Sequence, residues 1–297
     1  MMQNIGFIGI GNMGIGMAAN LAKFGHRVRV FDLSKDAIAR AVEQGCTASD
    51  SVKSAVENAD IVITMLPAGA HVLAVYGDEG GVFNHAKSGA LLIDCSTIDV
   101  ETARKVSKLA SDKSFEMLDA PVSGGTIGAA QGTLTFMCGG SDNTFNRSKQ
   151  VLEIIGENIF HAGASGNGQA AKICNNMLLG ICMIGTSEAF NLAEKLGLDA
   201  QVFFDISKTA SGQNWSMTSY CPAPGPVPKA PSNKDYAAGF SAAMMLKDLR
   251  LSQEASIQTG ASTPLGARAK ALYELMGEQG HSDLDFSAVI KLLADSL

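Results

Sequence analysis

Three residues of one long apolar segment are spaced so that they lie on a single helix face, and two of them carry polar side chains that could act together. Gly168, Lys172 and Asn176 follow one another at intervals of four, and residues at this spacing lie on one face of a helix. That face would otherwise suit apolar residues, given surrounding residues such as Ile173 and Met177. A lone lysine on a helix is usually solvated. A glycine that permits close approach and an asparagine one turn away instead favour a functional pair.

A second charged pair, Lys247-Asp248, lies inside the apolar helical pattern of residues 244–251, and Phe240 comes shortly before it. Such a pair indicates either a functional position or an ordinary ion pair on the protein surface. The residues by themselves leave both interpretations open.

Ser123, Gly124 and Gly125 end the segment DAPVSGG, which follows an apolar strand pattern. A serine hydroxyl beside successive glycine N–H groups can form a concave nest for an oxyanion or a carboxylate. The alternative is a flexible turn that binds nothing.

Near the N-terminus, the residues Gly9-Ile10-Gly11-Asn12-Met13-Gly14 form the pattern G-x-G-x-x-G between a strand pattern and a helix pattern. In dinucleotide-binding folds the first glycine allows a tight turn and the second lets the backbone approach the pyrophosphate. The third permits close packing of helix on strand. The helix that follows presents free N–H groups to the anion. An ordinary glycine-rich turn is the alternative, but the strand before and the helix after favour a dinucleotide site.

Asp32 ends the next strand pattern, 21 residues after Gly11. A carboxylate at this position accepts a hydrogen bond from a ribose 2′-hydroxyl and repels a 2′-phosphate. Lys35 follows and would weakly favour a phosphate, although its place at a helix start is typical of a solvated residue. The sequence therefore predicts NAD as the cofactor in preference to NADP.

Two further segments stand where strand patterns end. Ligands of open α/β sheets bind beyond the carboxyl ends of the strands, so we expect Met65, Leu66, Pro67 and Thr97 to line the cofactor cleft. The alternative is ordinary turn chemistry, with Ser96 or Thr97 as the N-cap of a helix.

Short apolar runs alternate with helical patterns through the first half of the chain. Uninterrupted apolar runs are typical of strands covered on both faces, and alternation of the two kinds of element predicts a doubly wound parallel sheet of the Rossmann type. The predicted strands are 4–9, 27–31, 61–65, 91–94, 117–120 and 133–138, and the predicted helices are 13–23, 35–44, 100–112 and 142–155.

The second half has a different character. A long apolar pattern runs over 169–195, and further helical patterns cover 200–209, 242–259, 265–279 and 286–294, without a convincing strand. The Pro-rich stretch 221–231 predicts a surface loop, because proline fixes φ and removes a backbone donor. We therefore predict a Rossmann-like domain over 1–164 and an all-helical domain over 165–297.

Composition excludes several classes of function. The chain has 297 residues, 46% of them hydrophobic, and a formal charge of −6, so it can bury a core and lacks the basic patch that nucleic acid requires. We expect no membrane span, since no apolar run approaches about 18 residues. The six cysteines and five histidines lack the spacing of metal ligands. Without a recognisable leader at the N-terminus, the cytoplasm is the expected location.

The segments GIGNMG (9–14), DAPVSGG (119–125), GQAAKICNN (168–176) and KDL (247–249) together resemble the β-hydroxyacid dehydrogenase family, and the resemblance covers essentially the whole chain. The family has a Rossmann-like domain joined by a long helix to a helical domain. The stretch SGQNWSM (211–217), the Pro-rich stretch and Gly239-Phe240 resemble in particular the branch that oxidises 3-hydroxyisobutyrate to methylmalonate semialdehyde, a step of valine breakdown.

This resemblance assigns roles to residues already singled out. It implies that Ser123, Gly124 and Gly125 bind the substrate carboxylate, that Lys172 is the acid/base and that Asn176 orients the substrate. It also implies that Lys247 lies near the nicotinamide and Asp248 at the substrate side. Trp215 and Phe240 are then expected to form the apolar wall for the methyl branch of the substrate.

In the mechanism that this implies, neutral Lys172 takes the hydroxyl proton as hydride leaves for NAD. Burial and the positive nicotinamide ring would both disfavour the charged ammonium. The alternatives are tartronate semialdehyde reduction, oxidation of serine-like hydroxy acids, or an NAD-binding sensor without catalysis. Imine reductases share the fold but usually replace the lysine. A long apolar helix in a helical domain predicts a homodimer or homotetramer.

Overall fold

The computed structural model describes residues 2–294 and 296–297. Its internal contacts divide the chain into two compact units, Met1–Lys172 and Ile173–Leu297. The division falls within one long helix, α9 (Asn167–Lys195). We propose the boundary between residues 164 and 165 instead, because a boundary there lies before α9 and does not divide that helix.

The first unit is built on one sheet, which has nine strands among the described residues, and the predicted fold class is confirmed. Neighbouring strands follow the order β3-β2-β1-β4-β5-β6-β8-β7, and β9 pairs with β8. The strands from β3 to β6 are parallel, whereas β8 is antiparallel to β6 and β7. The strands are β1 (Asn4–Ile8), β2 (Arg27–Phe31), β3 (Thr47–Ala48), β4 (Ile61–Thr64), β5 (Leu91–Asp94), β6 (Glu116–Asp119), β7 (Val122–Ser123), β8 (Leu134–Gly139) and β9 (Gly156–Gly163).

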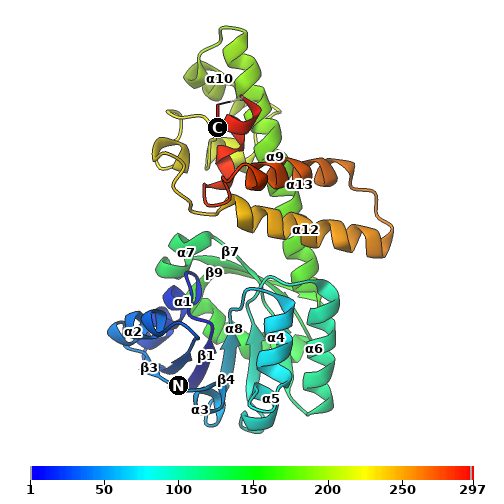
Figure 1. Ribbon diagram of the computed structural model, residues 1–297. Helices are drawn as coiled ribbons and strands as arrows, with labels where there is room; N and C mark the ends of the chain where they lie inside the picture. Colours follow the sequence, from blue (N-terminus) through cyan, green and yellow to red (C-terminus); the bar gives the residue numbers. More distant parts are fainter. Residues whose placement is uncertain (1, 295) are drawn as a thin grey trace. The chain divides into compact units, whose positions relative to one another are not determined.

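Helices cover both faces of this sheet (Figure 1), which explains the uninterrupted apolar runs. All four residues of β4 and of β5 are buried. One core packs the sheet against α1, α2, α7 and α8, and a second core packs the other face against α3, α4, α5 and α6. Their bounds are α1 (Gly14–Lys23), α2 (Lys35–Glu43), α3 (Val52–Val56), α4 (Gly69–Gly77), α5 (Val82–His85), α6 (Val100–Asp112), α7 (Gly125–Gln131) and α8 (Asp142–Ile155).

The regular secondary structure described in the second unit is helical, apart from two isolated β-bridges. It contains the greater part of α9, then α10 (Ala200–Ser207), α11 (Trp215–Thr218), α12 (Ala242–Thr259), α13 (Pro264–Glu278) and α14 (Val289–Leu293), with 3₁₀ turns at Pro231–Asn233 and Phe286–Ala288. Its core surrounds Met183, Met245 and Tyr273, which are fully buried. The predicted helix over 286–294 is therefore a 3₁₀ turn followed by a short α-helix.

The Pro-rich stretch is an irregular segment, as predicted, but it is not wholly on the surface. Cys221 and Ala230 are buried. Ser232 donates a 2.7 Å hydrogen bond to the carbonyl of Cys221, and the hydroxyl of Tyr236 donates one of 2.8 Å to the carbonyl of Pro222. These bonds replace the backbone pairing that proline prevents, and they fix the segment against the helical core.

Candidate functional site

The glycine-rich loop after β1 has the geometry of a dinucleotide cradle. Gly9 has a φ of +87°, and a Cβ there would lie 2.3 Å from the carbonyl oxygen of Met65. A Cβ on Gly14 would lie 2.1 Å from the carbonyl oxygen of Gly9, so the helix begins pressed against the turn. A Cβ on Gly11 would meet nothing within 4 Å, which leaves the backbone open to a bound group.

This arrangement fits the pyrophosphate of NAD. The loop lies where the strand order reverses, since β1 has β2 on one side and β4 on the other, and ligands of open α/β sheets bind at such a point. Asn12 and Gly11 are exposed, and Met13 is the residue from which α1 starts. Exposed backbone at a helix N-terminus provides N–H donors for an anion.

Asp32 is joined to this loop by its side chain. Its two carboxylate oxygens accept hydrogen bonds from the backbone N–H of Ile10 at 2.9 Å and of Ser34 at 2.8 Å. The acid therefore lies beside the cradle, as its predicted role toward the ribose requires. Lys35 is the first residue of α2, after Ser34 as N-cap, and is exposed.

The ends of β4 and β5 are also brought to the cradle. The backbone N–H of Leu66 donates a 2.8 Å bond to the Ser96 hydroxyl, and Leu66 lies 3.0 Å from the ideal Cβ position of Gly9. Pro67 is exposed and Thr97 half-buried. The alternative role of Ser96 or Thr97 as an N-cap is wrong, because Asp99 caps α6 with a 2.7 Å bond from the Thr102 N–H.

A buried carboxylate beneath these loops was not anticipated from the sequence. Asp94 accepts hydrogen bonds from the hydroxyls of Thr64 at 2.7 Å and Ser96 at 2.6 Å. The hydroxyl of Tyr76 lies 3.1 Å from that of Thr64. Burial raises the pKa of Asp94 to about 6, against the opposing effect of these hydrogen bonds. The signal available in the sequence was an acid ending an otherwise apolar strand.

Asp119, at the end of β6, has a side chain that contacts the start of α9. Its carboxylate accepts bonds from the backbone N–H groups of Gly166 at 2.7 Å and Gln169 at 3.1 Å. Burial raises the pKa of Asp119, and the backbone donors oppose that rise. Its main chain continues into Ser123, Gly124 and Gly125, which lie at the end of β7 and the start of α7. Gly124 and Gly125 both have positive φ, at +129° and +62°.

Lys172 and Asn176 lie one turn apart on α9 and both are buried, at 7% and 2% exposure. The alternative of a solvated lysine is therefore wrong. The side-chain amide of Asn176 donates a 2.5 Å hydrogen bond to the carboxylate of Asp248 on α12. Asp248 is itself buried, so it does not form an ion pair on the surface, whereas Lys247 beside it is half-buried.

The structure brings Trp215 and Phe240 into one aromatic cluster through two residues that the sequence did not single out. The ring of Trp215 stacks on that of Tyr220, with their centroids 5.1 Å apart. The Tyr220 ring in turn packs on Phe286, with a centroid separation of 5.4 Å. Phe240 packs edge-on against the same Phe286 at 5.6 Å. The hydroxyl of Tyr220 donates a 2.8 Å bond to Asp285, which also accepts from the N–H of Phe240.

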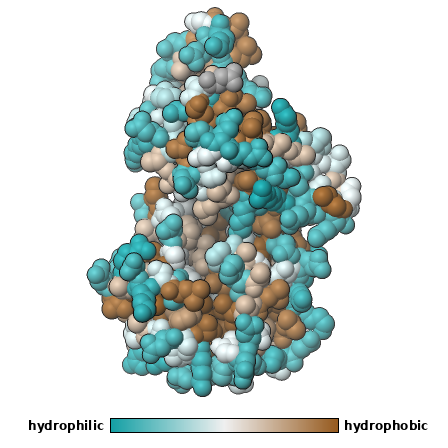
Figure 2. Space-filling model, in the orientation of Figure 1, coloured by the Kyte–Doolittle hydropathy of each residue, from teal (hydrophilic) through white to brown (hydrophobic). Residues whose placement is uncertain are grey.

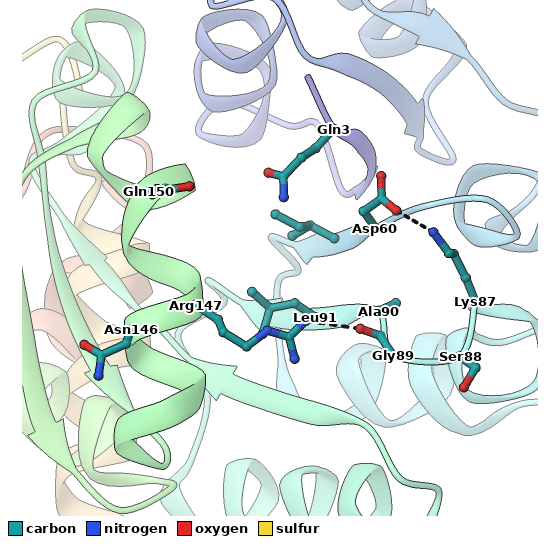
Figure 3. A pocket seen from close by; sticks show the side chains of 11 residues that line it. Gln3, Asp60, Lys87, Ser88, Gly89, Ala90, Leu91, Asn146, Arg147 and Gln150 are labelled. Carbon is teal, nitrogen blue, oxygen red and sulfur yellow. Dashed lines mark hydrogen bonds and ion pairs between the residues drawn. The ribbon is translucent and has the colours of Figure 1, made fainter. Parts of the chain in front are cut away.

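A pocket of about 580 Å³ lies elsewhere on the first unit, at the amino ends of β4 and β5 (Figure 3). Lys87 on its wall forms an ion pair with Asp60 at 2.6 Å, and Arg147 donates a 3.2 Å bond to the carbonyl of Gly89. None of the predicted site residues lines this pocket.

Within the described part of the chain, no group of three or more His, Cys, Asp or Glu side chains could hold a metal ion. The helix α9 is long and apolar enough to cross a membrane by length and composition, with 44% of its most apolar window buried. The core helix of a soluble protein meets the same test. Figure 2 shows hydrophilic and apolar residues intermixed over the visible face.

Family models match both parts of the chain. Residues 4–163 match the NAD binding domain of 6-phosphogluconate dehydrogenase. Residues 166–293 match a domain described as the NAD-binding part of NADP-dependent 3-hydroxyisobutyrate dehydrogenase.

Full-length relatives share this organisation. The chain is 51% identical to 3-hydroxyisobutyrate dehydrogenase and 48% identical to NAD-dependent L-serine dehydrogenase, both from Pseudomonas aeruginosa, over 98% of this chain and of each relative. The solved structure of Mycobacterium tuberculosis 3-hydroxyisobutyrate dehydrogenase with L-serine matches with a TM-score of 0.94 at 49% identity, over 99% of both chains. An imine reductase from Myxococcus stipitatus, 15% identical with a TM-score of 0.66, shares the fold alone.

Proposed function

Because the chain belongs to the β-hydroxyacid dehydrogenase family and is an NAD-dependent dehydrogenase, we propose that it oxidises 3-hydroxyisobutyrate to methylmalonate semialdehyde. The observation that carries the proposal is the pair of buried polar residues on α9. Lys172 and Asn176 share one helix face, and Asn176 is bonded to buried Asp248. A buried lysine one turn from a buried asparagine is an arrangement that general acid–base chemistry uses.

Lys172 is the group that moves the proton. In its neutral form the Nζ atom takes the proton of the substrate hydroxyl. When bound, NAD would supply the acceptor for the hydride on the carbon that carries this hydroxyl. The alcohol thus loses one hydride and one proton and becomes an aldehyde, and Lys172 releases the proton to solvent before the next turnover.

The other site residues orient the substrate. Asn176 holds the hydroxyl in place for Lys172, with its own amide fixed by Asp248. Ser123, Gly124 and Gly125 bind the substrate carboxylate through a hydroxyl and backbone N–H groups. Lys247 lies toward the nicotinamide in this proposal, and Asp248 toward the substrate.

The choice of substrate depends on the group at the central carbon. Both 3-hydroxyisobutyrate and L-serine have a carboxylate and a primary hydroxyl, but the first has a methyl group where the second has an ammonium. The aromatic cluster of Trp215, Tyr220, Phe240 and Phe286 supports the methyl group. A methyl group in an apolar pocket gives about 10- to 200-fold discrimination.

L-serine is the second candidate, and two findings favour it. One relative at 48% identity is named as an L-serine dehydrogenase, and the matching solved structure is described with L-serine. An aromatic face also attracts an ammonium group. Tartronate semialdehyde and other small β-hydroxy acids remain further alternatives within this family.

The test is initial rates of NADH formation with both enantiomers of 3-hydroxyisobutyrate and of serine, and of NADH consumption with tartronate semialdehyde. We expect kcat/KM for 3-hydroxyisobutyrate to exceed that for L-serine by at least about 10-fold. A preference for L-serine would overturn the substrate assignment while leaving the hydride-transfer chemistry intact. No turnover with any of them would favour a sensor that binds NAD without catalysis.

We further propose a role in valine breakdown in the cytoplasm, with a homodimer or homotetramer as the working form. Relatives from Dictyostelium and Drosophila are named as mitochondrial, which differs from the location proposed for this chain. Light scattering of the purified chain measures its mass in solution and tests the oligomer directly.

A further inference from the structure

We propose that Asp119 is a positioning residue for Lys172, because its carboxylate fixes the first turn of the helix that carries the lysine. The inference rests on the proposed function, in which Lys172 moves the proton. Asp119 does not touch the reacting atoms in this proposal and acts only through the backbone of α9.

The contact joins parts of the chain that are far apart in sequence. The two carboxylate oxygens of Asp119 accept from the N–H groups of Gly166, just before α9, and Gln169, in its first turn. The first N–H groups of a helix have no partners within the helix. A side chain 47 to 50 residues earlier therefore supplies the cap of α9.

Close packing leaves no space between this helix start and the strand beside it. A Cβ on Gly168 would lie 2.3 Å from the carbonyl oxygen of Met137 and 2.7 Å from a carboxylate oxygen of Asp119. A Cβ on Gly139 would lie 2.6 Å from the same carboxylate. The backbone of α9 is thus held directly against β8 and Asp119.

Gln169 provides a second attachment for the same turn. Its side-chain amide donates a 2.7 Å bond to the carbonyl of Ser96, and its oxygen accepts a 3.1 Å bond from the N–H of Ile98. The residue between them is Thr97, predicted to line the cofactor cleft. The start of α9 is therefore tied both to the end of β6 and to the loop after β5.

These attachments matter for catalysis because Lys172 is less than one turn beyond Gln169. Asp119 also leads, through its own main chain, to the proposed carboxylate site at Ser123–Gly125. One residue thus sets the position of the proton acceptor and begins the segment that holds the substrate. A misplacement of about 1 Å in such a pair can lower the rate about 100-fold.

The test is a double-mutant cycle of Asp119→Asn with Lys172→Ala, measured by kcat and by calorimetric NAD binding. Asparagine is neutral and isosteric, so it avoids the burial penalty of the charge but replaces one acceptor oxygen with a donor. We expect Asp119→Asn to lower kcat by about 10- to 100-fold, with NAD affinity within about twofold. In the Lys172→Ala background it should lower kcat further by less than about twofold, because coupled residues are not additive.

A second variant reaches the same turn without altering any polar group. Gly168→Ala forces the start of α9 away from Asp119 and should lower kcat in the same way, again only when Lys172 is present. Gly185→Ala is the matched control, because Gly185 lies on α9 with nothing within 4 Å of its ideal Cβ position. It should leave kcat unchanged.

The outcomes separate this inference from the function on which it rests. Near-normal turnover of Lys172→Ala alone would refute the role of the lysine, and the inference with it. A large loss in Lys172→Ala, with Asp119→Asn lowering kcat equally in both backgrounds, would refute the positioning role only. If neither Asp119→Asn nor Gly168→Ala folds, the contact serves the fold of the unit and the positioning role is overturned.

Discussion

The side-chain amide of Asn176 is fixed from both ends, since its nitrogen donates to Asp248 at 2.5 Å and its oxygen accepts from the amide of Asn175 at 2.9 Å. An amide with both groups engaged cannot rotate freely. Asn176 is therefore a preset feature of the helix face that also carries Lys172, and substrate need not order it. Replacing Lys172 and replacing Asn176 should therefore lower kcat by different amounts.

Replacing Lys172 with alanine should lower kcat by about 10²- to 10⁴-fold, the usual contribution of a general acid–base group. NAD affinity should stay nearly unchanged, because the predicted pyrophosphate site is at Gly9–Gly14. Lys172→Arg should fail nearly as badly, since arginine stays protonated. Asn176→Ala should lose less, because the proton acceptor remains. Steady-state kinetics with calorimetric NAD binding measure all three.

The matched control is Lys195→Ala, which removes an exposed lysine from the other end of α9 and should leave turnover unchanged. Near-normal turnover of Lys172→Ala would place the base elsewhere, with Asp248 the next residue to examine.

Asp32→Asn should raise the use of NADP relative to NAD, because it removes the charge that repels a 2′-phosphate. Asparagine is the better choice than serine, since its amide oxygen can still accept from the N–H of Ile10 and so preserve the glycine loop. The ratio of kcat/KM for NAD to that for NADP is the measurement. If the wild-type protein already prefers NADP, Asp32 does not govern the choice and Lys35 becomes the residue to change.

Trp215→Ala should weaken the use of 3-hydroxyisobutyrate by about 10-fold or more while sparing NAD affinity. The substitution removes the ring that stacks on Tyr220 and so opens the proposed apolar wall. Trp215→Phe keeps an aromatic ring and should retain most of the activity. Titration of NAD into the alanine variant is the check, and a large loss of cofactor affinity would show that Trp215 does not belong to a substrate pocket.

Asp94 should make the protein less stable as the pH rises from about 4 to about 6. Its pKa in the folded protein is about 6, above the ordinary value of 3.8, so the native state binds more protons than the unfolded state in this window. The loss in the free energy of unfolding is complete above about pH 6 and amounts to at most about 3 kcal/mol. Asp94→Asn should remove this part of the pH dependence, as measured by urea unfolding at several pH values.

Asp50→Asn serves as the comparison, because it removes a carboxylate that is exposed instead of buried. An unchanged profile in Asp94→Asn would mean that another group, with Asp119 the first candidate, is responsible for the dependence.

Elements with strong periodicity were predictable from the sequence, and some bounds agree to the residue. The helices at Val100–Asp112, Asp142–Ile155 and Ala242–Thr259 are examples. The strand β9 was missed because it is mostly solvent-accessible along its length and, among the described strands, pairs with β8 alone. A strand of this kind shows no apolar run, so its residues carry little signal of pairing.

Some residues of the candidate site could likewise be predicted from the sequence, and others could not. The glycine loop and Asp32 could be predicted because a local spacing of glycines and an acid is itself the motif. The contacts of Asp119 with Gly166 and Gln169 could not, because they join residues about 50 apart and depend on how β6 and β8 pair. Tyr220 was missed because an isolated tyrosine gives no sign of the rings that it will join.

The unequal surroundings of the three glycines in the loop after β1 bear on how such a chain would change over generations. A side chain at Gly9 or Gly14 collides with backbone, so folding alone preserves these two residues. A side chain at Gly11 meets nothing in the protein, so only the need for the cofactor preserves it. A descendant that had lost dehydrogenase activity would keep the first and third glycines and drift at the second.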